Sequence, residues 1–208
     1  MVSLPSSLTD KLDAVNILLQ LIGEAPVNSL SSSEDVDVAA ALLAIDEFDL
    51  HTQSHGWHWN REEDVTLTPN NAGNIVMPTN CLSISKAYWS IGGVRSGTPL
   101  KVVERGRKLY NKSDKTLQFS EPVQVDMIIR LEWEEMPEYA RRYITLAAGK
   151  HFQGRLQTNS GVDRVTDEAL TSALAILHHR DDEGEENNAL TGNPEVIYRL
   201  HGRVRRRF

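Results

Sequence analysis

The hydrophobic period of this chain changes twice, and no other feature of the sequence constrains the fold as strongly. Residues 8–54 and 137–180 carry apolar side chains at helical spacings of three and four, whereas residues 57–133 are rich in β-branched and aromatic residues and in turn signals. A β segment enclosed by two helical segments predicts an α+β fold. We expect a four-helix bundle-like domain with an antiparallel β-sheet domain inserted between its second and third helices.

Two helices are predicted before the β segment. The first, over residues 8–22, ends at Gly23, which suits a left-handed stop, and Pro26 prevents the helix from resuming. Its apolar stripe is Leu8, Leu12, Val15, Leu19 and Ile22. The second helix, over residues 34–54, follows a serine run that can cap its N-terminus. It is expected to bury Val38, Leu42, Ile45 and Phe48.

The β segment contains one clear strand and one hairpin. Residues 123–133 alternate apolar and polar side chains, which is typical of a strand. Residues 108–111 and 116–119 flank a polar turn and predict a hairpin. Trp57 and Trp59 are two positions apart, so on a strand both indoles would face one side. They either pack in the core or anchor a protein interface or domain junction, where tryptophan is enriched.

Two further helices are predicted after the β segment. One covers residues 137–157 with the stripe Tyr139, Tyr143 and Ala147, and the other covers residues 162–180 with the stripe Val162, Val165, Ala169, Ala173 and Ile176. These boundaries place the two parts of the helical domain at 1–55 and 135–182 and the inserted β domain at 56–134. Residues 183–208 are predicted to be an acidic linker followed by a docking tail.

The charge of the chain is unevenly distributed. The whole chain carries −7, while five arginines and one glutamate from Pro194 onward give +4, so the remainder carries −11. An acidic body argues against nucleic-acid binding as the main function. The tail is expected to dock on a partner, with docking on the chain's own body and a disordered basic end as alternatives. The residues concerned are Val196, Ile197, Tyr198, Arg199, Leu200, Arg203, Arg205, Arg206, Arg207 and Phe208.

No catalytic residue, metal ligand or cofactor site is predicted. His51 and His55 have the i, i+4 spacing of a helical zinc site, but Thr52 stands where a metalloprotease needs glutamate and no further ligand is evident. Carboxylates cluster at residues 62–64 and 132–135, where a solvated acidic surface explains them. The single cysteine, Cys81, reads as a small buried thiol and fits a reducing compartment. Neither a membrane span nor a secretory signal is expected.

The order of several short segments resembles the tail tubular protein A family of short-tailed autographiviruses. The resemblance begins with LDAVNILLQLIGEAPVNSL (12–30) and QSHGWHWN (53–60). It continues through LTPNNAGNIVMP (67–78), GRKLYNKS (106–113), EEMPEYARRYIT (134–145) and AGKHFQGRL (148–156), and so covers nearly the whole chain.

The resemblance implies a non-enzymatic virion protein, made in the host cytoplasm and located at the head-to-tail junction. It implies a dodecameric ring between the portal protein and the nozzle formed by tail tubular protein B, with tail fibres nearby. DNA would pass through the ring without sequence-specific binding, and no membrane is involved. Two other hypotheses remain from the residues: a cell-envelope glycan hydrolase using the carboxylates near Glu62 or Glu134, and a DNA-binding module using the arginine tail.

Overall fold

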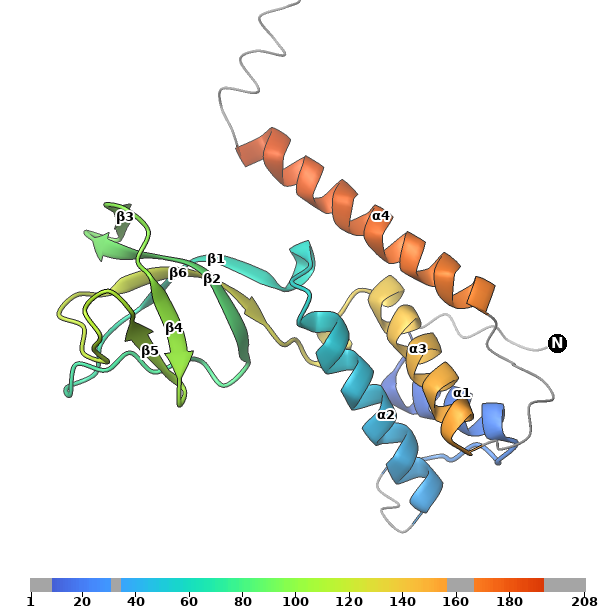
Figure 1. Ribbon diagram of the computed structural model, residues 1–208. Coiled ribbons are helices and arrows are strands. Elements are labelled where there is room, and N and C mark those ends of the chain that lie inside the picture. Colours follow the sequence, from blue (N-terminus) through green and yellow to red (C-terminus); the bar gives the residue numbers. More distant parts are fainter. Residues whose placement is uncertain (1–8, 31–34, 157–166, 193–208) are drawn as a thin grey trace, which may run out of the picture. The chain divides into compact units, whose positions relative to one another are not determined.

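The computed structural model describes residues 9–30, 35–156 and 167–192, and these form two units joined twice through the backbone (Figure 1). The first unit consists of the described residues of Met1–Phe48 and Met136–Phe208, and it is helical. The second unit, Asp49–Glu135, contains every strand of the described chain. The predicted α+β fold, with four long helices and antiparallel sheets, is confirmed.

Helix α1 (Lys11–Ile22) begins and ends at residues that satisfy its free backbone groups. The Asp10 carboxylate accepts a hydrogen bond from the Asp13 N–H at 2.7 Å, and Asp13 accepts one in return from Asp10. Gly23 adopts φ 91°, which closes the C-terminus as expected of a left-handed glycine cap. The helix therefore starts at Lys11 rather than at residue 8, because Asp10 is its cap.

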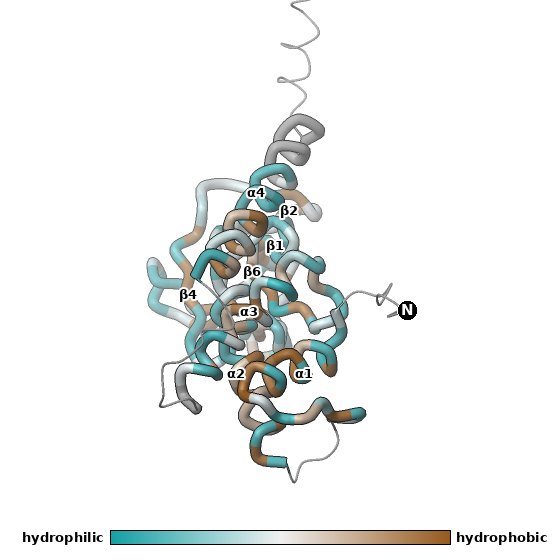
Figure 2. The backbone as a smooth tube through the Cα atoms, turned by 90° about the vertical axis from the view of Figure 1, so that its right-hand side faces the viewer, coloured by the Kyte–Doolittle hydropathy of each residue, from teal (hydrophilic) through white to brown (hydrophobic). Residues whose placement is uncertain are grey.

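Three more helices follow, α2 (Val36–Gln53), α3 (Glu138–Leu156) and α4 (Asp167–Gly192), and all but the last turn of α2 belongs to the first unit. Helix α3 contacts both α1 and α4, and apolar segments run along α1 and α2 (Figure 2). The core of this unit is rich in alanine, which lets the helices approach closely. Its fully or nearly fully buried apolar residues include Val15, Leu18, Leu19, Ile45, Ala140, Ile144, Ala148, Phe152, Ala173 and Leu177.

The predicted stripes of the last two helices are partly wrong. Tyr139 and Tyr143 are only half-buried, because α3 turns Ala140 and Ile144 inward instead. On α4, Ala169 and Ile176 are exposed and Leu177 is buried. The helix also continues to Gly192, so the acidic run predicted as the start of a linker is helical. Leu8, Val162 and Val165 lie outside the described residues.

The second unit contains a four-stranded antiparallel sheet in the order β1–β6–β2–β3 and a two-stranded sheet of β4 and β5. The strands are β1 (Arg61–Leu67), β2 (Cys81–Ile91), β3 (Val94–Ser96), β4 (Val102–Arg105), β5 (Lys108–Asn111) and β6 (Val123–Ile129). Short 3₁₀ turns precede and follow the sheet at η1 (His58–Asn60) and η2 (Trp133–Glu135). The strand β5 pairs with β4, while residues 111 and 116 of the predicted hairpin make only an isolated bridge.

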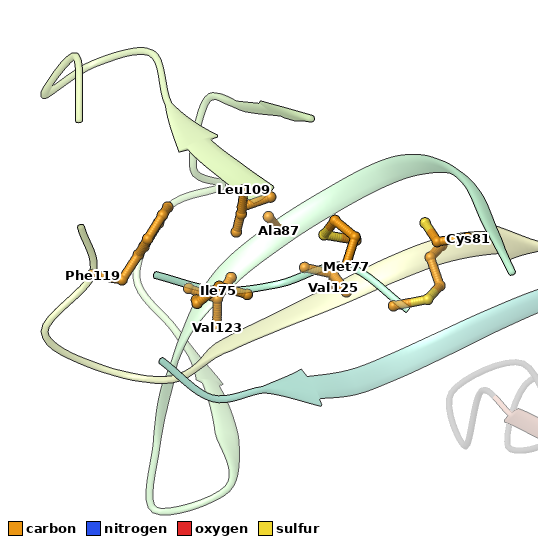
Figure 3. Close-up of a cluster of buried hydrophobic side chains, with 9 residues drawn as sticks. Ile75, Met77, Cys81, Ala87, Leu109, Phe119, Val123 and Val125 are labelled. Carbon is orange, nitrogen blue, oxygen red and sulfur yellow. The ribbon is translucent and has the colours of Figure 1, made fainter. Parts of the chain in front are cut away.

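The core of the second unit lies between its two sheets. Side chains from β2, β5 and β6, from the segment before β2 and from the segment between β5 and β6 point toward one another (Figure 3). The cluster consists of Ile75, Met77, Cys81, Ala87, Leu109, Phe119, Val123, Val125 and Met127. Backbone hydrogen bonds from Leu109 to Ile75 and from Met77 to Arg107, each 2.9 Å, hold the segment before β2 against the neighbourhood of β5.

The predicted strand over residues 123–133 is too long. Strand β6 ends at Ile129, and the backbone of Leu131 is hydrogen-bonded by the Gln53 side chain instead of a neighbouring strand.

The contact between Gln53 and Leu131 also explains where the two units divide. The division falls at Phe48/Asp49, inside α2, whereas the sequence places it at residue 55. The last turn of α2 belongs with the sheet because Gln53 and Asp49 bond to the residues that follow β6.

Gly56, which follows α2, supplies a backbone conformation that other residues adopt at a cost. Its φ is +79°, and a Cβ there would lie 2.9 Å from Ile128 Cγ1 and closer still to Cδ1. We therefore expect Gly56→Ala to lower the free energy of unfolding by about 2 kcal/mol, through left-handed strain and displacement of Ile128. Urea denaturation followed by tryptophan fluorescence measures this loss.

Gly154 provides the matched control. It lies in α3, and the position that a Cβ would take there has nothing within 4 Å, so Gly154→Ala is expected to gain about 0.5–1 kcal/mol from helix propensity. A Gly56→Ala variant as stable as the wild type would contradict the strain assigned to this turn.

Within the described part of the chain, no helix has the length and apolar character needed to cross a bilayer.

Candidate assembly surfaces

The two predicted tryptophan anchors lie on a 3₁₀ turn and its N-terminal flank, not on a strand. Trp57 precedes η1 and is buried, and its indole N–H donates a 2.7 Å hydrogen bond to the Thr52 carbonyl. Its ring stacks on His55 with the centroids 5.1 Å apart. Trp57 therefore packs within the unit Asp49–Glu135, and the expectation that both indoles share a strand face is wrong.

Trp59 is half-buried and differs from Trp57 in its hydrogen bonding. Its Nε1 is buried and has no hydrogen-bond acceptor among the described residues. The Oγ1 of Thr52 and the Oδ1 of Asn60 are also buried and unpaired in the same part of the described chain. The role of Trp59 as an interface anchor remains a prediction.

A hydrogen-bond network that the sequence did not reveal fixes the end of α2 to the sheet. The fully buried Gln53 amide donates to Asp49 Oδ1 at 2.7 Å and to the Leu131 carbonyl at 3.0 Å, and its oxygen accepts from the Leu131 N–H at 2.7 Å. Asp49 Oδ2 is in turn held by Arg130 at 2.7 Å and 3.0 Å. Asn60 adds bonds to the carbonyls of Gln53 and Ile129.

Arg95 on β3 is a second feature that sequence reasoning missed. Its guanidinium pairs with both Asp64 and the buried Asp126, and it lies 5.0 Å from the ring centroid of Tyr88. Asp64 has φ 58° at a bulge in β1, and its N–H also donates to Asp126 at 3.1 Å. The acidic residue at 64 is therefore part of a structural clamp, since one of its oxygens is occupied by Arg95.

In the described part of the chain, neither the His51–His55 pair nor the acidic cluster at residues 132–135 belongs to a group that could hold a metal. His51 and His55 are exposed, and the described residues contain no group of three or more His, Cys, Asp or Glu side chains that could hold a metal. Glu134 and Glu135 are exposed in η2, and Glu135 accepts a hydrogen bond from the Glu132 N–H at 3.1 Å. This second acidic cluster therefore forms a local cap on the surface.

Cys81 and Tyr139 are two of the described ionisable groups whose pKa values are displaced by their surroundings. Burial raises the pKa of the Cys81 thiol, and the nearby Glu104 charge raises it further. Burial also raises the pKa of Tyr139, with Asp181 adding to the effect. Both shifts favour the neutral form at pH 7, so Cys81 is a protonated thiol in the sheet core and a poor nucleophile.

Large apolar side chains project from one side of α2. Val36 is 79% exposed and Leu43 is 71% exposed, and Leu50 continues the same line at a spacing of seven. A spacing of seven is two helical turns, so these residues share one face of the helix. We call Val36, Ala39, Leu43 and Glu47 the α2 outer face. The opposite face of the same helix buries Val38, Ala41 and Ile45.

Further exposed large apolar side chains lie elsewhere on the described chain. Ile176 on α4 is 48% exposed, although α4 packs on α3 through Ala173 and Leu177. At the tip of the β2–β3 hairpin, Ile91 and Val94 pair across the Gly92–Gly93 turn and are 64% and 66% exposed. Exposed apolar groups of this size mark contact surfaces more often than catalytic sites.

A family comparison decides what kind of protein carries these surfaces. The model of the family described as tail tubular protein matches residues 12–187. The chain belongs to the tail tubular protein family. The match spans both units, so the resemblance stated from the sequence is confirmed at the level of the family.

Two individual proteins that match this tail tubular family member have low sequence identity to it. Tail tubular protein A of Klebsiella phage KP34 is 28% identical over 135 residues, which are 64% of this chain and 66% of that protein. The match thus spans just under two thirds of the relative's length. A solved structure described as the neck of an empty GTA particle, computed with C6 symmetry, covers 85% of this chain and 92% of its own at 12% identity and a TM-score of 0.33.

The predicted docking tail of this tail tubular family member lies outside the described residues. It comprises Val196, Ile197, Tyr198, Arg199, Leu200, Arg203, Arg205, Arg206, Arg207 and Phe208. The surfaces that the structure adds, the α2 outer face and the hairpin tip, were missed at the sequence level. The signal for the first was present, because Val36, Leu43 and Leu50 repeat at seven on the side away from the predicted stripe.

Proposed function

We propose that this protein is a non-enzymatic virion component that forms an adaptor ring at the head-to-tail junction. The ring, a dodecamer, joins the portal protein to a nozzle of tail tubular protein B, with tail fibre protein near the junction. The observation that carries the proposal is the match of the tail tubular family model across residues 12–187. This span includes all the described helices and strands except the first residue of α1 and the end of α4.

The exposed apolar side chains of the described chain support an assembled state. Val36 and Leu43 on α2, Ile176 on α4 and Ile91 and Val94 on the hairpin lie at separate places. A subunit of a ring must contact a neighbour on each side and a different protein above and below, so several such surfaces are expected.

The charge of the chain supports a ring that lets DNA pass. Outside the arginine-rich C-terminal segment the chain carries −11. A channel lined by acidic side chains repels phosphates, whereas a basic lining would retain them. DNA is therefore a passing cargo in this proposal, and no sequence-specific contact is required.

Measurement of the mass in solution tests the proposed function. Light scattering of the purified protein, alone and mixed with its matching portal, is expected to give either a ring or a monomer that joins the portal in a fixed, large ratio. A variant that lacks residues 194–208 is expected to keep its fold and lose the portal complex, since the apolar and basic tail is proposed to dock on the portal or an adjacent subunit. A monomer that ignores the portal would overturn the proposal.

A further inference from the structure

We propose that neighbouring copies of this chain contact each other through the α2 outer face of one copy and the exposed face of α4 on the next. The inference rests on the ring proposed above and names the surfaces through which its subunits meet. Residues 36–47 of α2 and 169–180 of α4 belong to the same unit, and their exposed faces have the same spacing, complementary side-chain sizes and opposite charges at one end.

Helix α2 is apolar on two opposite sides. Val38, Ala41 and Ile45 are buried, whereas Val36 and Leu43 project outward. Apolar side chains on a helix surface are normally covered, so a helix with apolar residues on two opposite sides is expected to be covered on both. The outward side of α2 therefore carries the most exposed large apolar side chains of the described helical unit, and contact with another copy would remove them from water.

Helix α4 has a complementary exposed face. Ala173 and Leu177 are buried, and the exposed residues Ala169, Ser172, Ile176 and Arg180 line the helix surface beside them, where Ile176 is 48% exposed. We call these four residues the α4 outer face. Ile176 is its one large apolar side chain, flanked on the N-terminal side by small residues that allow a second helix to approach closely.

The two outer faces repeat the same spacing. Positions 36, 39, 43 and 47 are separated by three, four and four residues, and so are positions 169, 172, 176 and 180. When the two helices lie side by side and parallel, Leu43 meets Ile176 and Glu47 meets Arg180. Val36 and Ala39 then meet Ala169 and Ser172, so each large side chain faces a smaller or matching one.

The charges at the ends of these faces are opposite. Glu47 is acidic, and Arg180 is exposed with Glu183 as its partner at 2.9 Å on the same helix. An exposed i, i+3 pair of this kind contributes little to stability, so Arg180 can turn to an acidic group on another copy at small cost. A pair between copies, partly screened from water by Leu43 and Ile176, would set the direction of the contact.

The use of two different faces fits a ring. A contact between two α2 helices would be two-fold and would close after two copies, leaving the α4 outer face uncovered. A contact from α2 to α4 is heterologous, so each copy offers one face to each neighbour and the chain of contacts can continue until it closes.

Cross-linking between single-cysteine variants tests this pairing. In a Cys81→Ala background, which removes the one native thiol, Leu43→Cys and Ile176→Cys are purified separately and treated with a short bis-maleimide. We expect each variant alone to stay uncross-linked, the mixture to give covalent dimers, and the variant with both cysteines to give a ladder of higher oligomers. Arg142→Cys, an exposed position on α3, replaces either partner as the control and should not cross-link.

Charge reversal provides a second readout that does not depend on cysteine. Glu47→Arg or Arg180→Glu alone is expected to weaken association about tenfold, and the two together are expected to restore it. Both experiments are carried out with and without the matching portal. A ring whose subunits show neither the cross-link nor the rescue overturns this inference and leaves the adaptor function intact. Failure to form any ring, alone or on the portal, overturns both.

Discussion

Replacing Gln53 by leucine is expected to lower the free energy of unfolding of the sheet-containing unit by about 3 kcal/mol. The Gln53 side chain is fully buried and hydrogen-bonds to Asp49 and to both backbone groups of Leu131. Leucine has a similar size, so packing changes little, but the N–H and carbonyl of Leu131 and one oxygen of Asp49 lose this partner. The cost comes from leaving buried polar groups without hydrogen bonds.

The isosteric change Gln53→Glu separates the contribution of the hydrogen bonds that the Gln53 amide donates from that of the bond that its oxygen accepts. The introduced carboxyl can still accept from the Leu131 N–H, but it places a second acidic group beside Asp49 Oδ1, where the amide now donates at 2.7 Å. Burial and the Asp49 charge both raise the pKa of the introduced carboxyl in the folded state. A folded pKa above the unfolded value means that the folded protein binds the proton more tightly, so this variant gains stability as the pH falls from 7 to 5.

Tryptophan fluorescence during urea denaturation measures the free energy of unfolding of the unit Asp49–Glu135 in both variants. All four tryptophans, at positions 57, 59, 89 and 133, lie in the unit Asp49–Glu135. Gln118→Leu, a glutamine outside the core of the same unit, is the control and is expected to change stability by less than about 0.5 kcal/mol. A Gln53→Leu variant that matches this control would show that the network at the end of α2 is not needed.

Local sequence signals predicted the helices well because their causes are local. The C-terminal signal of α1 lies one residue beyond the helix, and the structure uses Gly23 as predicted, whereas the Asp10 cap at the N-terminus was not predicted. The stripe of α2 was also largely correct, since Val38 and Ile45 are buried and Leu42 and Phe48 half-buried. The spacing of Trp57 and Trp59 did not reveal the local structure, because two apolar residues separated by one position also fit a 3₁₀ turn. A strand is indicated only when the alternation continues over more residues.

The features that the sequence did not predict depend on distant partners. Strand β6 ends early because Gln53, 78 positions away from Leu131, replaces a neighbouring strand. The Arg95 clamp joins residues 64, 95 and 126, and nothing in their local spacing indicates that they meet. The α2 outer face was ambiguous for another reason: apolar residues on both sides of one helix do not reveal which side the monomer itself covers.

Replacing Arg141 by alanine is expected to have the largest effect, a loss of about 4 kcal/mol from the helical unit. Arg141 on α3 is only 4% exposed, and its guanidinium donates to the carbonyls of Met136 at 3.0 Å and of Thr9 at 3.1 Å. Thr9 is also held by the Glu138 carboxylate, which accepts from its N–H at 3.0 Å and from its hydroxyl at 2.6 Å. The start of α3 thus fixes the segment that leads into α1.

The variant Arg141→Met separates the contribution of the hydrogen bonds to this loss from the contribution of the cavity. Methionine keeps most of the apolar stem and removes both hydrogen bonds, so a loss of about 2 kcal/mol is expected for the bonds alone, and the rest of the alanine effect measures the cavity. Far-UV circular dichroism during urea denaturation follows the helices. Arg142→Ala, the exposed neighbour on the same helix, is the control and should stay within about 0.5 kcal/mol of the wild type. If Arg141→Ala cost no more than this control, the junction between α3 and the start of α1 would not depend on the buried guanidinium.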